Sequence, residues 1–489
     1  MTAPLQSQPA PGAAASPWRH VPDEIDFSCR LPLLVLFLSS AIWLVIGSLG
    51  YLLASIKFHQ ANFLANPSWL TYGRLQPAAF NAVLYGGVIQ GALSVALWLL
   101  ARLGETPAQR ISLTFGASLW NLGVTIGFLG ILAGDSTGFA TLEFPRYSVL
   151  FLMLGYLVIG VCGAIIFHRR QRRKTFVAQW FVFAALFWFP WIYSTAELLL
   201  SVFPVRGVNQ AVVAWWYAEN LLTVWLGLIG LATIFHFIAR LLDRELHSHY
   251  LALVTFWLLI LFGGWGGIPV TAPVPAWMPS VSTVATVLMV VPLLAVALNV
   301  HGTLSGRFAA LKGNSSLRFI LFGAVSFLMA GAMKILGVLC DAQQQLVLTW
   351  FTSARTQLYL FGFVAMALIG AIYYILPRLV GTGFASPKLL RLHFWLAALG
   401  VIFLIVPLAA AGIVESLGLQ NAKLSFMDVF KSTLPFLRVS TMGYLFLLVA
   451  NALFLVNLSR LVAQFYRERA AAALAVATED LFKRAEAKA

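Results

Sequence analysis

Four ionisable residues, Glu197, Glu219, Lys334 and Arg355, lie inside or at the ends of apolar segments that are long enough to enter a membrane. A charge within a lipid-embedded segment costs several kcal/mol unless it is paired or hydrated, and such residues are candidates for functional sites. Three explanations are open for each of them: a partner inside the protein, a water-filled cavity, or a side chain that reaches the membrane surface.

The residues that could bind a metal are scattered. The chain has eight histidines and three cysteines, and Cys29, Cys162 and Cys340 are far apart, without a C-x-x-C or C-x-x-C-H motif. This spacing offers no disulfide framework, zinc ribbon or covalent heme attachment. We interpret the cysteines as small apolar packing residues.

The composition is typical of a polytopic membrane protein. Hydrophobic residues make up 60% of the 489 residues, charged residues 10%, and the mean hydropathy is +0.87. A helical span needs ~20 mainly apolar residues. Twelve stretches qualify, at about Leu31–Ile56, Ala78–Leu100, Ile111–Ala133, Tyr147–Phe167, Ala178–Val202, Val212–Phe237, Tyr250–Ile268, Thr283–Val300, Leu317–Leu339, Gln357–Leu376, Leu392–Ile413 and Phe436–Leu461.

Lysine and arginine are concentrated in alternate loops. Both tails and the loops after even-numbered spans are basic, including the cluster Arg169–Lys174. The opposite loops carry few basic residues, namely Lys57, Arg74, Arg146, Arg206, Lys423, Lys431 and Arg438. The positive-inside rule therefore predicts that both termini are cytoplasmic. The net charge of +15 is explained by attraction to anionic lipid headgroups, and no nucleic-acid partner is expected, since no soluble domain presents these residues.

Three regions follow from this pattern. Residues 1–26 are rich in Ala, Pro and Ser near their start and are predicted to be a disordered cytoplasmic tail. The first apolar run is too long for a signal peptide. Residues 27–463 form the predicted membrane domain, and residues 464–489 a cytoplasmic helical tail.

Seven short motifs resemble subunit I of the C-type (cbb-type) heme-copper oxidases. Tyr72–Pro77 is similar to the family's F-G-R-L-R-P, and Trp215–Tyr217 to the start of its W-W-Y-G-H-N. Further matches follow in the same order at Val177–Phe181, Thr303–Gly306, Leu317–Phe319, Gly362–Met366 and His393–Ala397. The resemblance implies an all-α integral membrane protein, a bundle of twelve transmembrane helices.

The same resemblance implies six histidine ligands for two hemes and a copper ion, and this chain has none of them. The positions that correspond to ligands are occupied by Ala79, Glu219, Gly267, Ile268, Arg355 and Gln357. The family's metals lie toward the outer side of the membrane. By the predicted topology, only His59 lies on that side, in a loop, and one histidine cannot form a bis-histidine heme site.

The resemblance and the missing ligands together imply a cofactor-free relative of the oxidase subunit in the bacterial inner membrane. Such a protein could be a scaffold, assembly or ligand-handling subunit of a respiratory complex, with the lipid bilayer, other subunits or a c-type cytochrome as partners. An alternative is an active oxidase or nitric oxide reductase that holds heme b and copper with unorthodox ligands. A secondary transporter would require an internal repeat with paired broken helices, and only Gly263–Gly267 interrupts a span.

The residues that replace the ligands predict how the space is filled. Glu219 and Arg355 derive from positions that face a common site, so we expect their side chains to point inward and to interact directly or through Asn220 or Gln357. Four bulky residues are expected to fill part of the volume of the hemes, namely Phe80, Gln357, Tyr359 and Phe361.

Overall fold

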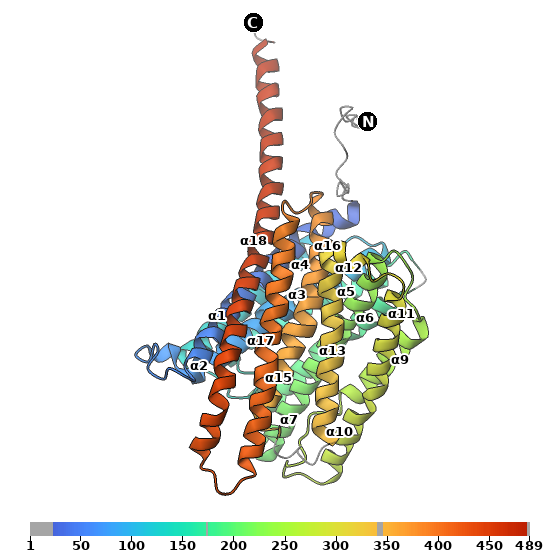
Figure 1. Ribbon diagram of the computed structural model, residues 1–489. Helices are drawn as coiled ribbons and strands as arrows, with labels where there is room; N and C mark the ends of the chain where they lie inside the picture. Colours follow the sequence, from blue (N-terminus) through green and yellow to red (C-terminus); the bar gives the residue numbers. More distant parts are fainter. Residues whose placement is uncertain (1–22, 173–174, 340–345, 487–489) are drawn as a thin grey trace.

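The computed structural model describes residues 23–172, 175–339 and 346–486, and within these ranges the chain is a bundle of helices (Figure 1). Most of the predicted tail 1–26, part of the cluster Arg169–Lys174 and Cys340 lie outside the described residues. The first helix begins at Glu24, where the Asp23 carboxylate accepts a hydrogen bond of 2.9 Å from the backbone N–H of Asp26. This is the usual N-cap arrangement.

The helices follow one another with short connections. Their bounds are α1 Glu24–Ile56, η1 Ser68–Leu70, α2 Tyr72–Asn81, η2 Ala82–Ile89, α3 Gln90–Gly104, α4 Arg110–Ala133, α5 Arg146–His168, α6 Val177–Glu197, η3 Leu198–Val202, α7 Val208–Glu219, η4 Asn220–Leu226, α8 Gly227–Leu241, α9 His249–Gly263, α10 Trp277–Leu288, α11 Val290–Leu304, α12 Ala310–Gly313, α13 Ser315–Leu339, α15 Trp350–Gln357, η5 Leu358–Ala365, α16 Met366–Val380, α17 Pro387–Leu419 and α18 Phe426–Glu486.

Eleven helices of the described chain are long and apolar enough to cross a membrane. Twelve were predicted, and the difference lies in the seventh, Tyr250–Ile268. That segment forms α9, which has 15 residues and falls short of the ~20 needed to span the hydrocarbon core. Its helix stops at Gly263 because the glycines that follow have a weak helical preference, and Gly267 adopts a φ of +95°.

Three spans are much more buried than the others, namely α2–η2–α3, α7–η4–α8 and α15–η5–α16. Each changes from α-helix to π-helix and back within the membrane-crossing segment. The π-helix starts within three residues of Ala79, directly after Glu219 and directly after Gln357. Local π-helix is rare and often marks functional sites. Three of the four π-helical segments in the described chain therefore lie beside positions that the resemblance assigns to ligands, and the fourth, η3, follows Glu197 at the end of the α6 span.

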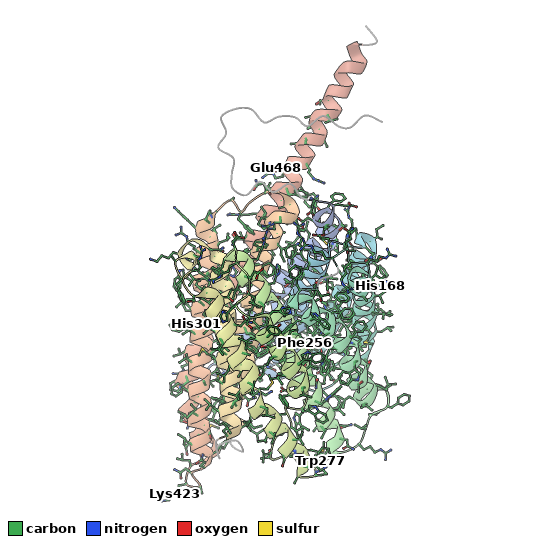
Figure 2. All side chains as sticks on the ribbon, turned by 90° about the vertical axis from the view of Figure 1, so that its right-hand side faces the viewer. His168, Phe256, Trp277, His301, Lys423 and Glu468 are labelled. Atoms are coloured by element: carbon green, nitrogen blue, oxygen red, sulfur yellow. The ribbon has the colours of Figure 1, made fainter. Side chains whose placement is uncertain are left out.

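The two described ends of the chain lie on one side of the bundle. The start of α1 and the end of α18 are both at the top of Figure 1, and α18 continues beyond the bundle as a single helix. Figure 2 shows Glu468 and His168 toward this side and Lys423 and Trp277 on the opposite side. The basic loops predicted to face the cytoplasm are on the side of Glu468.

This arrangement predicts the orientation in the membrane. Alkaline phosphatase fused after Lys423, which lies between α17 and α18, should be active because the positive-inside rule predicts a periplasmic position for that loop. Green fluorescent protein fused after residue 489 should fluoresce in the cytoplasm. An active phosphatase at the C-terminus would contradict the predicted orientation.

Candidate functional site

Glu219 lies under a glycine loop at the end of α7. Glu219 is 8% exposed. The loop that follows α9 covers it so closely that a Cβ atom on Gly267 would lie 2.8 Å from Cβ of Glu219, and one on Gly266 would lie 3.2 Å from its Oε1 atom. Only glycine fits at Gly267, where the positive φ also disfavours other residues. Glu219 and Gly267, two positions that the resemblance assigns to copper ligands, are thus brought into contact.

Lys334 supplies the cation that faces Glu219. Its Nζ atom, on α13, donates a hydrogen bond to Oε1 of Glu219 and forms an ion pair with it, and it lies 3.4 Å from the Thr223 hydroxyl. The two charged side chains are 15% and 9% exposed, so their attraction is poorly screened by water. The pair links α13 to α7 beneath the glycine loop.

Arg355 does not make the expected direct contact with Glu219. It interacts electrostatically with both Glu219 and Lys334 from α15, but in the described part of the chain it lies beyond ion-pair distance of Glu219. The sequence left three explanations open for Lys334, one of them a partner inside the protein, and did not identify Glu219 as that partner. The available signal was one lysine and one glutamate in two different apolar spans. The sequence does not show which side of α13 faces α7, so it could not pair them.

The two residues proposed as polar bridges serve other contacts. Asn220 donates to the carbonyl oxygens of Trp216 (2.9 Å) and Gly264 (3.1 Å) and accepts from Nε1 of Trp188 (3.1 Å). It therefore ties α7 to α6 and to the end of α9. Gln357 lines a separate cavity.

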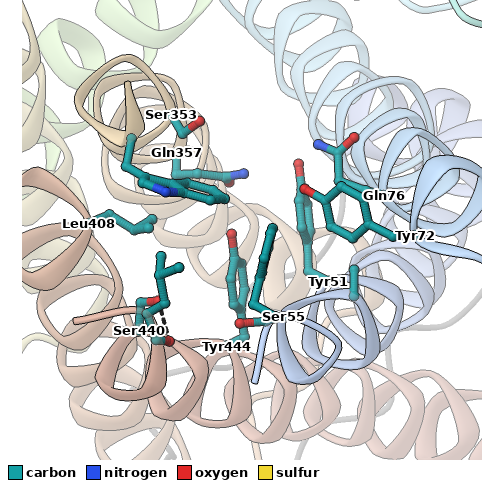
Figure 3. Close-up of a pocket in the computed structure, with 13 residues that line it drawn as sticks. Tyr51, Ser55, Tyr72, Gln76, Ser353, Gln357, Leu408, Ser440 and Tyr444 are labelled. Carbon is teal, nitrogen blue, oxygen red and sulfur yellow. Dashed lines mark hydrogen bonds between the residues drawn. The ribbon is translucent and has the colours of Figure 1, made fainter. Parts of the chain in front are cut away.

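That cavity occupies about 70 Å³ between α1, α2, α15, α17 and α18 (Figure 3). It lies beside two positions that correspond to heme ligands: Gln357 is in its wall, and Gln76, also in the wall, is one helical turn before Ala79. Ala79 itself is buried against Gly50 of α1, where a Cβ atom would come within 2.8 Å of the alanine Cβ. The cavity has room for roughly five water molecules. It is therefore far too small for a porphyrin.

Two of the bulky residues, Tyr359 and Phe361, contact other buried segments. The Tyr359 hydroxyl donates to the carbonyl oxygen of Thr223 at 3.4 Å, and the Phe361 ring packs edge-on against Tyr51 with centroids 6.2 Å apart. Ile268, the remaining former copper position, donates its backbone N–H to the Ser282 hydroxyl at 3.1 Å. Its side chain lines an apolar pocket of about 260 Å³ beside α6, α7 and α10.

The residues at these positions do not fit a heme or a copper ion. Alanine, glycine and isoleucine offer no side-chain ligand, and the cations Lys334 and Arg355 repel a metal ion. In the described ranges, no three His, Cys, Asp or Glu side chains are grouped in a way that could hold a metal. His168 and His301 lie toward the upper side in Figure 2, whereas α7 lies in the lower half of Figure 1.

The fold is that of a heme-copper oxidase subunit. The solved structure of a heme-copper terminal oxidase dimer matches 90% of this chain and 84% of its own chain with a TM-score of 0.73, at 14% sequence identity. The model of the family described as "Cytochrome C and Quinol oxidase polypeptide I" matches residues 32–446. This chain belongs to that family.

Curated relatives agree over most of their length. The cbb3-type cytochrome c oxidase subunit CcoN1 of Stutzerimonas stutzeri is 25% identical over 402 residues, covering 77% of this chain and 82% of the relative. Cytochrome c oxidase subunit 1 of Rhodobacter capsulatus is 25% identical over 454 residues, covering 86% and 83%.

The ion pair predicts coupled effects on stability. Glu219→Gln or Lys334→Met alone should lower the free energy of unfolding by about 2–3 kcal/mol, because each leaves a buried charge without its partner. The double variant should lose about 1–2 kcal/mol less than the sum of the single losses. Unfolding in mixed detergent micelles, followed by tryptophan fluorescence, measures both. The control is the double variant Glu219→Gln with Arg355→Gln. A coupling energy between Glu219 and Arg355 equal to or above that between Glu219 and Lys334 would contradict the assignment of Lys334 as the partner.

A partly buried carboxyl group that is hydrogen-bonded to Asn81 predicts a pH dependence. Glu143, in the loop between α4 and α5, accepts a hydrogen bond of 2.9 Å from Asn81, and burial raises the pKa of its carboxyl group from 4.5 to about 7. Its stabilising contribution is therefore complete below pH 4.5 and is lost as the pH rises through 7, an effect of about 3 kcal/mol. Glu143→Gln should remove this slope, whereas Glu468→Gln, at an exposed site, should keep it. Equal slopes in wild type and Glu143→Gln would refute the shift.

Proposed function

We propose that this chain is a cofactor-free relative of cbb-type cytochrome c oxidase subunit I that serves as a scaffold, assembly or ligand-handling subunit of a respiratory membrane complex. The observation that carries the proposal is the ion pair between Glu219 and Lys334. It occupies the place where the resemblance puts copper ligands, and it places the ammonium group of Lys334 against Glu219, the one carboxylate among the six positions that the resemblance assigns to ligands.

An ammonium group in this position opposes metal binding in two ways. It has three donor hydrogens and no lone pair, so it cannot act as a ligand without losing a proton. Its charge also neutralises Glu219. Among the former copper positions, only Glu219 has a side-chain oxygen that could coordinate a metal ion. Electron transfer to oxygen requires a metal or organic cofactor, and the side chains at these positions supply no imidazole to hold one.

The family membership is also compatible with a catalytic function. The relatives from Stutzerimonas stutzeri and Rhodobacter capsulatus are named as cytochrome c oxidase subunits, and an oxidase or nitric oxide reductase with heme b and copper on other ligands would share their fold. The residues at the former ligand positions weigh against it. The same relatives support placement in the bacterial inner membrane and partnership with other oxidase subunits or a c-type cytochrome.

Absorption and metal content distinguish these functions. The purified chain should be colourless in the Soret region and contain no stoichiometric iron or copper, because none of the six former ligand positions offers an imidazole. The CcoN1 subunit of Stutzerimonas stutzeri, expressed and purified in the same way, is the positive control for heme supply. One equivalent of heme b per chain would contradict the cofactor-free proposal and support the competing function.

A further inference from the structure

The 70 Å³ cavity has a wall that is polar and uncharged. Its lining residues come mainly from α1, α2, α15, α17 and α18. Figure 3 shows Gln357 and Ser353 together on one side of the cavity, across from Tyr51 and Tyr444. None of the lining side chains carries a full charge. The neutral polar members are Tyr51, Ser55, Tyr72, Gln76, Ser353, Gln357, Ser440 and Tyr444.

Two atoms of this wall are buried and have no hydrogen-bond partner. They are the Tyr51 hydroxyl and Oε1 of Gln357, on residues that are 3% and 6% exposed. The Tyr51 hydroxyl lies close enough to the Gln357 side chain for the two to interact, but the contact does not meet the distance and angle criteria of a formed hydrogen bond. Buried polar groups in proteins are almost always satisfied, so each of these atoms calls for a partner in the space they share. By contrast, Ser55 and Ser440 already bond within the protein, to Thr441 and to the carbonyl oxygen of Leu437.

The walls are held in place by aromatic packing. Tyr51 stacks on Tyr444 with ring centroids 5.1 Å apart and an interplanar angle of 7°. Phe58 packs edge-on against both Tyr72 and Trp350, at 4.9 Å in each case. The cavity is thus preformed, which lowers the conformational cost of binding a small molecule.

We propose that the cavity binds a small neutral molecule that carries both a hydrogen-bond donor and a carbonyl acceptor, of the size of formamide or acetamide. Oε1 of Gln357 accepts from the ligand donor, and the Tyr51 hydroxyl donates to its carbonyl oxygen. The volume, roughly that of five water molecules, sets the upper size. The uncharged lining disfavours an ion, because a charge here would lack a counter-ion. This inference rests on the proposed function, since a heme at Gln357 would fill the same space.

Saturation-transfer NMR with acetamide, on the full-length protein in nanodiscs, tests the site. Wild type should show transfer to the acetamide methyl group at millimolar concentration. Gln357→Leu and Tyr51→Phe should each weaken acetamide binding at least tenfold, because each removes one hydrogen bond. Tyr51→Phe keeps the ring that stacks on Tyr444, so it serves as the test if Gln357→Leu fails to fold.

Gln464→Leu and Tyr466→Phe make the same chemical changes on the exposed part of α18 and should leave acetamide binding unchanged. A colourless protein without acetamide transfer would overturn this inference alone, with water as the occupant of the cavity. Unchanged acetamide binding in both cavity variants would also overturn it. A heme spectrum would instead overturn the proposed function.

Discussion

The high cost of an unpaired charge in a membrane-embedded interior governs the former copper position. Once Glu219 stands there, a cation must lie within reach. Lys334 answers this need from a neighbouring helix, and Gly266 and Gly267 then close over the pair. One ion pair therefore joins α7, α13 and the loop after α9, three segments that are far apart in the chain.

The backbone around this pair is set by packing that does not depend on metal ligands. The π-helical segments η2, η4 and η5 lie next to Ala79, Glu219 and Gln357, in the three most buried spans. Their surroundings are apolar and tightly fitted; Phe363 of η5, for example, lies against Gly230 of α8, where any side chain would collide with its ring. Close packing of this kind fixes a backbone through many small contacts. Ligand side chains can be replaced without changing the helices that carried them.

Sequence alone predicted the helical membrane architecture and the family, because hydropathy over ~20 residues and the order of several motifs are properties of the chain itself. Of the twelve predicted spans, eleven are long enough to cross a membrane in the described chain, and the seventh, α9, is shorter because glycines follow Gly263. It identified Glu219 as a buried charge but paired it with Arg355. Two charges at positions that face a common site need not touch, because the reach and direction of each side chain depend on helix rotation, which apolar spans with little amphipathicity do not encode.

The two regions that the resemblance assigns to cofactors differ in the side chains that line them. At the former copper position, the ion pair lies directly beneath Gly266 and Gly267, and the pocket beside it is lined mainly by apolar side chains. At Gln357, a cavity remains, and its wall keeps tyrosine, glutamine and serine where leucine or phenylalanine would pack with a gain in stability. A protein that only lost a cofactor would gain by filling such a space with apolar side chains. The polar wall with two unpartnered atoms therefore favours a ligand-handling role over that of a passive scaffold.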